Sequence, residues 1–178
     1  MTRALVVVES MFGNTQEIAR AVAGGIASTF RVEVVRVDRA PRTLDDDVRL
    51  LVVGGPTHAF GLSRPGTRLA ARDQGADPAV NVNVGLREWL AILRSGPNRV
   101  AVATFDTRIK KTGVPGSAAR GALRRLRRLG FPPAAAPCSF YVAGTDGPLL
   151  SGEVARARAW GALVAEKEAT AQQQGALP

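Results

Sequence analysis

The chain contains little histidine or cysteine: His58 and Cys138 are the only residues of these two types among 178. With one residue of each, a zinc site has almost no ligands to draw on, and no internal disulfide can form. Cys138 falls in an apolar run, which favours a buried small hydrophobe over a nucleophile. We therefore predict no metal site.

Aromatic and acidic residues are also few. Six Phe, two Trp and one Tyr are too few for the base-stacking platform of a protein that binds single-stranded nucleic acid. Asp and Glu number 15 against 24 Lys and Arg, which gives a formal net charge of +9. A basic balance fits nucleic acid, an anionic membrane or an acidic protein. The scarcity of aromatic residues disfavours nucleic acid and leaves an acidic protein among the partners that the charge allows.

The sequence also lacks long apolar runs and the residue groupings of hydrolases. No apolar run approaches membrane-spanning length and the N-terminus has no signal-peptide pattern, so we expect a cytoplasmic protein without a membrane partner. Because no paired carboxylates or nucleophile–base pair is evident, we predict no catalytic residue and disfavour a hydrolytic enzyme. What is present is an apolar content of 46%, enough for one domain with a substantial core.

Apolar runs and helical patterns alternate along the chain. We predict strands at 4–8, 30–37, 50–53, 100–104 and 138–143, and helices at 14–28, 85–93, 117–129 and 152–167. This alternation predicts an α/β fold: an open, doubly wound, five-stranded parallel sheet with helices on both faces, formed by a single domain at 1–169. Segment 54–84 shows no convincing period, and we expect the polar tail 170–178 to be flexible.

The first strand runs through a short polar turn at Gly13 into the first helix. Ser10, Asn14 and Thr15 offer hydroxyl and amide donors beside helix N-terminal N–H groups that have no intrahelical partner. A phosphate there would also meet the positive end of the helix dipole, whereas the alternative is an ordinary capped turn. No Lys follows the glycine and Gly-x-Gly-x-x-Gly is absent, which disfavours a nucleoside triphosphate and NAD.

This turn resembles the phosphate-binding loop of flavodoxins, Ser/Thr-x-Thr-Gly-x-Thr, through Ser10, Met11, Phe12, Gly13, Asn14 and Thr15. A second segment resembles their second flavin-binding loop, in which an aromatic ring commonly stacks on the flavin: Pro56, Thr57, His58, Ala59, Phe60 and Gly61. The resemblance spans about residues 4–168 and implies non-covalently bound FMN and the strand order 2-1-3-4-5. FMN at the switch point of flavodoxin is the standard example of ligand binding at the carboxyl ends of such a sheet.

The resemblance also implies a third site segment in a loop predicted from Thr104 to Pro115, facing the pyrimidine edge of the flavin. Its predicted site residues are Thr104, Phe105, Asp106, Thr107 and Arg108. Phe12, Phe60 and Phe105 thus fall in the three loops, where each could contact the flavin or fold back over the end of the sheet. His58 could likewise contact the flavin or form a local hydrogen bond. These alternatives stay open.

The resemblance implies a flavodoxin-like electron-transfer protein that shuttles electrons between a flavin reductase and an acceptor. One alternative is an NAD(P)H-dependent FMN quinone or nitro reductase, in which segment 54–84 forms the substrate pocket. A further alternative is a flavin-free interaction module with the same fold. The run Arg124-Arg125-Leu126-Arg127-Arg128 is either a solvated helix face or a docking surface for an acidic redox partner.

Overall fold

The computed structural model describes residues 2–110 and 115–175. The centre of the protein is a five-stranded sheet made of β1 (Arg3–Val8), β2 (Arg31–Arg36), β3 (Val48–Pro56), β4 (Ala101–Ile109) and β5 (Cys138–Val142). All neighbouring strands are parallel, in the order β2-β1-β3-β4-β5. The predicted α/β fold class and strand order are confirmed.

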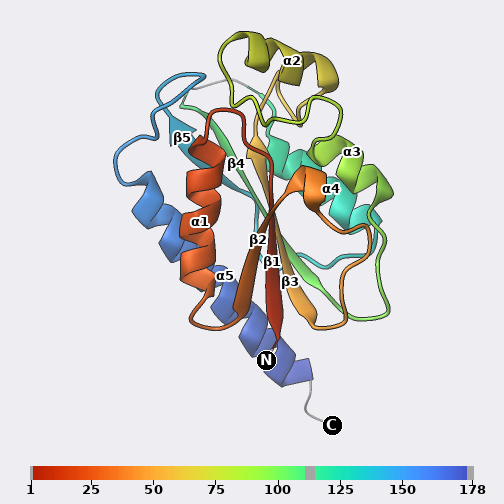
Figure 1. The fold of residues 1–178 in the computed structure, drawn as a ribbon. Helices are drawn as coiled ribbons and strands as arrows, with labels where there is room; N and C mark the ends of the chain where they lie inside the picture. Colours follow the sequence, from red (N-terminus) through yellow and green to blue (C-terminus); the bar gives the residue numbers. More distant parts are fainter. Residues whose placement is uncertain (1, 111–114, 176–178) are drawn as a thin grey trace.

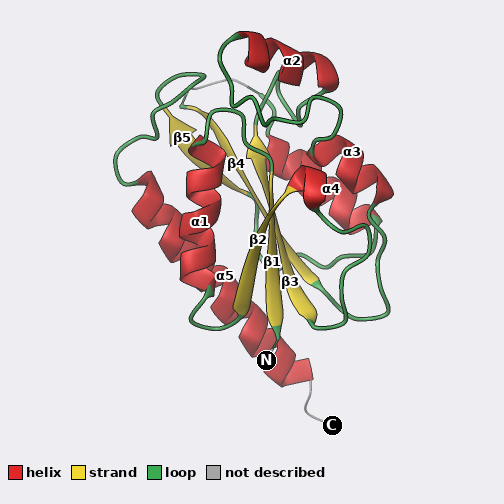
Figure 2. Cartoon of the chain, viewed as in Figure 1, coloured by secondary structure: helices red, strands yellow, loops and turns green. Residues whose placement is uncertain are grey.

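Helices cover both faces of this sheet. They are α1 (Asn14–Ile26), the 3₁₀ helix η1 (Val37–Arg39), α2 (Pro65–Asp73), α3 (Leu86–Ile92), α4 (Ala118–Arg128) and α5 (Glu153–Gly175). Helices α1 and α5 pack on one face and α3 and α4 on the other, while α2 lies beyond the carboxyl ends of the strands, at the top of Figures 1 and 2. None of these helices is both long and apolar enough to cross a membrane.

The continuous apolar run of β1 is buried because both of its faces are covered. Ala4, Val6 and Val8 pack in the core beneath α1 and α5. Leu5 and Val7 point the other way, into the core beneath α3 and α4. Since successive side chains of a strand alternate between faces, a strand in the middle of a doubly covered sheet must be apolar throughout.

Two strands extend further toward the carboxyl edge than the sequence predicted. β3 continues to Pro56 and β4 to Ile109. Asp106 and Thr107 are polar but buried, because side chains distant in sequence bond to them. The predicted loop from Thr104 is therefore strand over its first six residues, and its residues 111–114 lie outside the described part of the chain.

Two helical segments were also missed. α2 occupies part of segment 54–84, for which no period was evident. α5 continues to Gly175, so residues 170–175 of the predicted C-terminal tail are helical, and residues 176–178 lie outside the described part of the chain. The extension is anchored by Glu168, which is 2% exposed and accepts hydrogen bonds from Arg99 at 2.8 Å and Gln172 at 3.0 Å.

Candidate functional site

The carboxyl ends of β1, β3 and β4 open into a cavity of about 240 Å³. Ten of the predicted site residues line it: Met11, Phe12, Asn14, Thr15, Pro56, Thr57, His58, Ala59, Thr107 and Arg108. The three predicted segments therefore meet in one place. That place is the switch point between β1 and β3, where open parallel sheets bind ligands.

Three further lining residues were not predicted: Ile109, Val142 and Thr145. Val142 ends β5, and Thr145 belongs to the connection that follows. The predicted strand order contained the necessary signal, because β5 lies beside β4 and its carboxyl end reaches the same edge. Asn14 ties this connection to the first loop, since its Nδ2 donates to the carbonyl oxygen of Asp146 at 2.9 Å.

Gly13 and Ser10 shape the start of α1. Gly13 has a φ of 93°, a left-handed conformation that glycine adopts without steric penalty. The Ser10 hydroxyl accepts the N–H groups of Gly13 at 3.2 Å and Gln16 at 3.3 Å. The first-turn amides of Asn14 and Thr15 have no partner within the helix. Free amides at the positive end of a helix dipole are the kind of group that favours an anion.

Strand β4 holds the first and second loops together. The hydroxyls of Thr15 and Thr107 lie 2.7 Å apart and are buried. The carbonyl oxygen of Thr107 also accepts the N–H of Thr57 at 2.9 Å. Because a hydroxyl can accept and donate at once, Thr15 can accept from Thr107 and still donate its own proton to a ligand.

The second loop is a tight turn with an unusual backbone. His58 and Gly61 exchange two backbone hydrogen bonds, at 2.9 and 3.0 Å. The two residues between them, Ala59 and Phe60, have φ values of 44° and 70°, the pattern of a type I′ turn, which favours Gly and Asn. A left-handed conformation costs a residue with a Cβ about 1–2 kcal/mol. Neither central residue is glycine, so the local sequence does not indicate this turn.

The segment before α4 supports this strained turn. A Cβ on Gly116 would lie 2.0 Å from the carbonyl oxygen of Phe60, so the two backbones are in direct contact. Arg108 donates to the carbonyl oxygen of Gly116 at 2.7 Å. The Phe60 ring itself is 62% exposed, whereas Phe12 lines the cavity and packs beside Met11. Phe60 therefore neither covers the sheet end nor lines the cavity.

Asp106 is fully buried at the point where β4, the second loop and α4 meet. Its Oδ2 accepts hydrogen bonds from the hydroxyls of Thr57 at 2.9 Å and Ser117 at 2.5 Å, and from the N–H of Ala119 at 3.1 Å. The carboxylate thus caps the positive end of α4. Its Oδ1 is buried without a hydrogen-bond partner. Asp106 was predicted to contact the cofactor, but it lies behind the cavity and positions Thr57.

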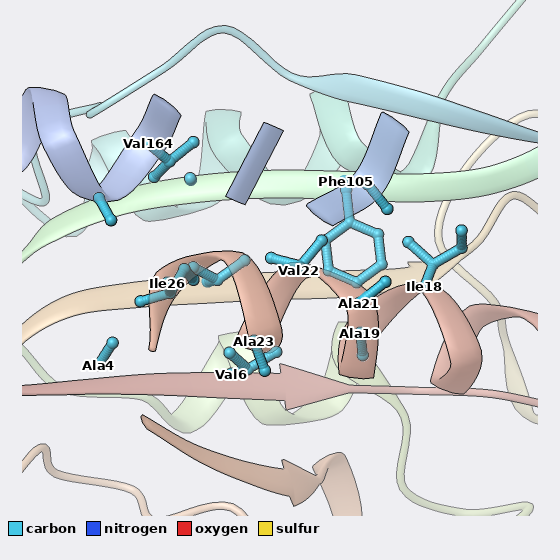
Figure 3. Packing of buried hydrophobic residues seen from close by; sticks show 14 of the residues in the cluster. Ala4, Val6, Ile18, Ala19, Ala21, Val22, Ala23, Ile26, Phe105 and Val164 are labelled. Carbon is cyan, nitrogen blue, oxygen red and sulfur yellow. The ribbon is translucent and has the colours of Figure 1, made fainter. Parts of the chain in front are cut away.

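Thr104 and Phe105, which were predicted to contact the cofactor, are buried and do not line the cavity. The Phe105 ring is buried in the core beneath α1, as Figure 3 shows, and its centroid lies 6.0 Å from that of Phe140 and 6.2 Å from that of Trp160. The hydroxyl of Thr104 donates to the carbonyl oxygen of Ala119 at 3.0 Å. Both residues face the core because β4 continues beyond them.

A second buried carboxylate supports the first loop. Glu9 Oε2 accepts the N–H of Leu86 at 2.7 Å, and Oε1 accepts the hydroxyl of Ser63. The Arg68 guanidinium is fully buried; it donates to Ser63 at 2.7 Å and pairs with Glu88 at 2.8 Å. Burial raises the pKa of the Glu9 carboxyl. This cluster of Glu9, Ser63, Arg68 and Glu88 holds segment 54–84, whose sequence showed no period, against β1 and α3.

His58 is half-buried in the wall of the cavity. Burial, together with the positive charge of Arg68, lowers the pKa of its imidazole below the ordinary value of 6.5. His58 is therefore neutral at pH 7, with one ring nitrogen able to donate and the other to accept. It contributes a polar but uncharged group to the site.

No protein-family model matches this chain, and no curated protein matches it by sequence. Solved structures do resemble it. Flavodoxin 1 from Bacillus cereus superposes with a TM-score of 0.66 at 14% identity, covering 93% of this chain and 98% of that one. A flavodoxin from the domain Archaea gives 0.61 at 19% identity, with coverages of 94% and 99%. A WrbA-like flavodoxin from Agrobacterium tumefaciens gives 0.56 at 17% identity, with coverages of 96% and 99%. The protein therefore has the flavodoxin-like fold.

Replacing Ala59 by Gly should stabilise the protein, because glycine adopts a φ of 44° without the Cβ penalty. The exposed methyl group of Ala59 contributes little burial, so we expect a net gain of about 1 kcal/mol in the free energy of unfolding. Urea unfolding of the wild-type protein and the Ala59→Gly variant measures this difference in the free energy of unfolding. A less stable glycine variant would contradict the strain assigned to this turn.

The imidazole of His58 should titrate below pH 6.5. Since the unfolded chain then binds a proton before the folded protein does, stability is retained above pH 6.5 and lost as the pH falls through the lower folded pKa. NMR of the single imidazole reports the titration directly, and His58→Gln should reduce the loss of stability on acidification. A midpoint at or above 6.5 would place His58 in a different environment from the one described.

Proposed function

We propose that this protein binds FMN at the carboxyl edge of its sheet and carries electrons between a reductase and an acceptor in the cytoplasm. The observation that carries the proposal is the meeting of the Gly13 turn and the His58–Gly61 turn at one cavity. The cavity lies at the switch point of a flavodoxin-like sheet, where such folds bind ligands. Its volume of about 240 Å³ is small for a ligand pocket, so part of a bound FMN would stay exposed.

The start of α1 would hold the phosphate. The amides of Asn14 and Thr15 and the hydroxyl of Thr15 are neutral donors, and the helix end supplies positive potential. Thr107 orients the Thr15 hydroxyl through the 2.7 Å contact between them. This arrangement suits a phosphate monoester without requiring a lysine.

The remaining walls suit a flat ring with polar edges. Pro56, Ile109 and Val142 supply apolar surface to the cavity, and His58 supplies a neutral polar group. Arg108 places a positive charge in the lining, which stabilises negative charge gained on reduction. The cofactor supplies the redox chemistry when bound, and the chain supplies binding, orientation and this electrostatic bias.

The structure of segment 54–84 favours a carrier over a reductase with its own substrate pocket. Only Pro56 to Ala59 of this segment line the cavity. Further along, Ser63 and Arg68 are buried. Asp77, Val80, Asn81 and Val84 line a separate cavity of only about 40 Å³, far below the volume of an ordinary ligand pocket. A protein that passes electrons to a partner needs an accessible cofactor edge and no second pocket.

Gly13→Val should weaken FMN binding about tenfold or more, equivalent to at least about 1.4 kcal/mol, and riboflavin binding much less. Valine at a φ of 93° is strained and displaces the amides that would meet the phosphate, which riboflavin lacks. Titrations followed by flavin fluorescence measure both ligands. The matched control is Gly130→Val, at another left-handed glycine with open space around it. Equal losses for the two ligands, or the same FMN loss in the control, would reject the phosphate assignment.

The carrier role predicts little direct turnover of small substrates. FMN-loaded protein, NADPH and a soluble quinone should consume NADPH no faster than free FMN does at the same concentration. Added reductase should then restore rapid consumption. Fast turnover without a reductase would instead support the quinone reductase alternative, and failure to bind FMN at all would support the flavin-free interaction module.

A further inference from the structure

Helix α4 carries an unusual concentration of positive charge. Its eleven residues include no acidic side chain and five arginines: Arg120, Arg124, Arg125, Arg127 and Arg128. Within residues 2–110 and 115–175, no ion pair involves any of these five. The charge of this helix is therefore left without compensation by the described part of the chain.

The spacing of these arginines works against helix stability. Arg120, Arg124 and Arg128 follow one another at intervals of four residues, where like charges repel and a carboxylate would stabilise the helix. The helix dipole favours cations in the last turn, which accounts for Arg127 and Arg128 but not for Arg120 near the first turn. An ordinary solvated helix face would alternate the two signs of charge.

Neighbouring groups increase the crowding. Arg87 of α3 lies close enough that its charge, with those of Arg128 and Arg124, adds to burial in lowering the pKa of Arg125. The nearby carboxylate of Glu88 is already paired with Arg68 at 2.8 Å. The positive potential of this surface is thus maintained across two helices.

The arginines border an open groove of about 480 Å³. Arg120, Arg124, Arg127 and Arg128 supply its charged lining, and Leu123 and Pro137 supply its apolar lining. Leu126, by contrast, is fully buried against the sheet. Apolar contacts surrounded by charge are typical of a protein interface. The groove lining contains no aromatic ring on which a nucleic acid base could stack.

We propose that this groove docks an acidic segment of a protein partner, which in the proposed function is the redox partner of the bound flavin. The position of α4 fits this role. The helix starts two residues after Gly116, which contacts the backbone of Phe60 in the turn beside the cavity. The groove runs from Arg120, near this end of the helix, toward Pro137, which precedes β5. A partner seated in it would have to extend past Arg120 to reach the edge where electrons enter or leave.

The test neutralises the groove and compares it with an equal loss of charge elsewhere. The groove variant carries Arg→Gln at positions 120, 124, 127 and 128. The control carries Arg20→Gln, Arg39→Gln, Arg158→Gln and Lys167→Gln, four exposed cations outside α4, three of them on the helices of the opposite face. Both proteins lose the same net charge, and thermal unfolding confirms that both are folded.

The probe is a fluorescently labelled poly-L-glutamate of about 20 residues, titrated at low and physiological salt, with a short DNA duplex as the second ligand. We expect the groove variant to lose about tenfold or more in affinity for polyglutamate, and the control no more than about threefold. Equal losses in the two variants would overturn the proposal. Tighter binding of DNA than of polyglutamate, lost only in the groove variant, would overturn it in favour of nucleic acid.

This measurement is independent of the flavin. A groove effect in protein that fails to bind FMN would leave the docking surface intact and reject the electron-carrier role. Tight FMN binding with no difference in polyglutamate affinity between the two variants would reject the docking surface and leave the electron-carrier proposal standing. The two proposals can therefore fail separately.

Discussion

The carboxylate of Asp106 is the interaction on which the arrangement of the candidate site depends. It is fully buried, and it accepts hydrogen bonds from the second loop through Thr57 and from the start of α4 through Ser117 and Ala119. Removing a hydrogen-bond partner from a buried carboxylate leaves its oxygen without a donor, which lowers the stability of the folded protein. Strand β4, the second loop and the start of α4 are therefore held in one relative position. The hydrogen bond to Thr57 also anchors the strained turn that follows it.

Glu9 likewise links a strand to a helix start, here at the carboxyl end of β1. It follows β1 directly and bonds to Leu86 at the start of α3, while Arg68 links its neighbour Ser63 to Glu88. Glu9 directly follows β1, whereas Asp106 lies within β4, and both bond to the start of a helix. The two carboxylates thus hold the segments next to the first and second loops through hydrogen bonds made by the chain itself.

The sequence predicted the sheet and the first loop because their signals are local: an apolar run, a glycine and a capped helix start. It predicted a loop at Phe105 and Asp106, where the structure has strand, because polar residues in β4 indicate a loop until their distant partners are known. Glu9 and Leu86 are 77 positions apart, so no periodicity could reveal their contact. The left-handed turn at Ala59 and Phe60 was hidden for the opposite reason, since neither residue favours that backbone. FMN, the redox partners and the cytoplasmic location remain predictions.

Mapping of backbone amide shifts by NMR during titration with FMN tests the central claim most directly. If the flavin binds at the carboxyl edge, the largest shifts will fall on the amides of Gly13 to Thr15, on those of Thr57 to Gly61 and on Arg108, because these residues line the cavity or belong to the two turns beside it. The amides of the outer end of α4, near Arg127, should stay unchanged. Shifts concentrated on α4, or none at all at saturating FMN, would contradict the account.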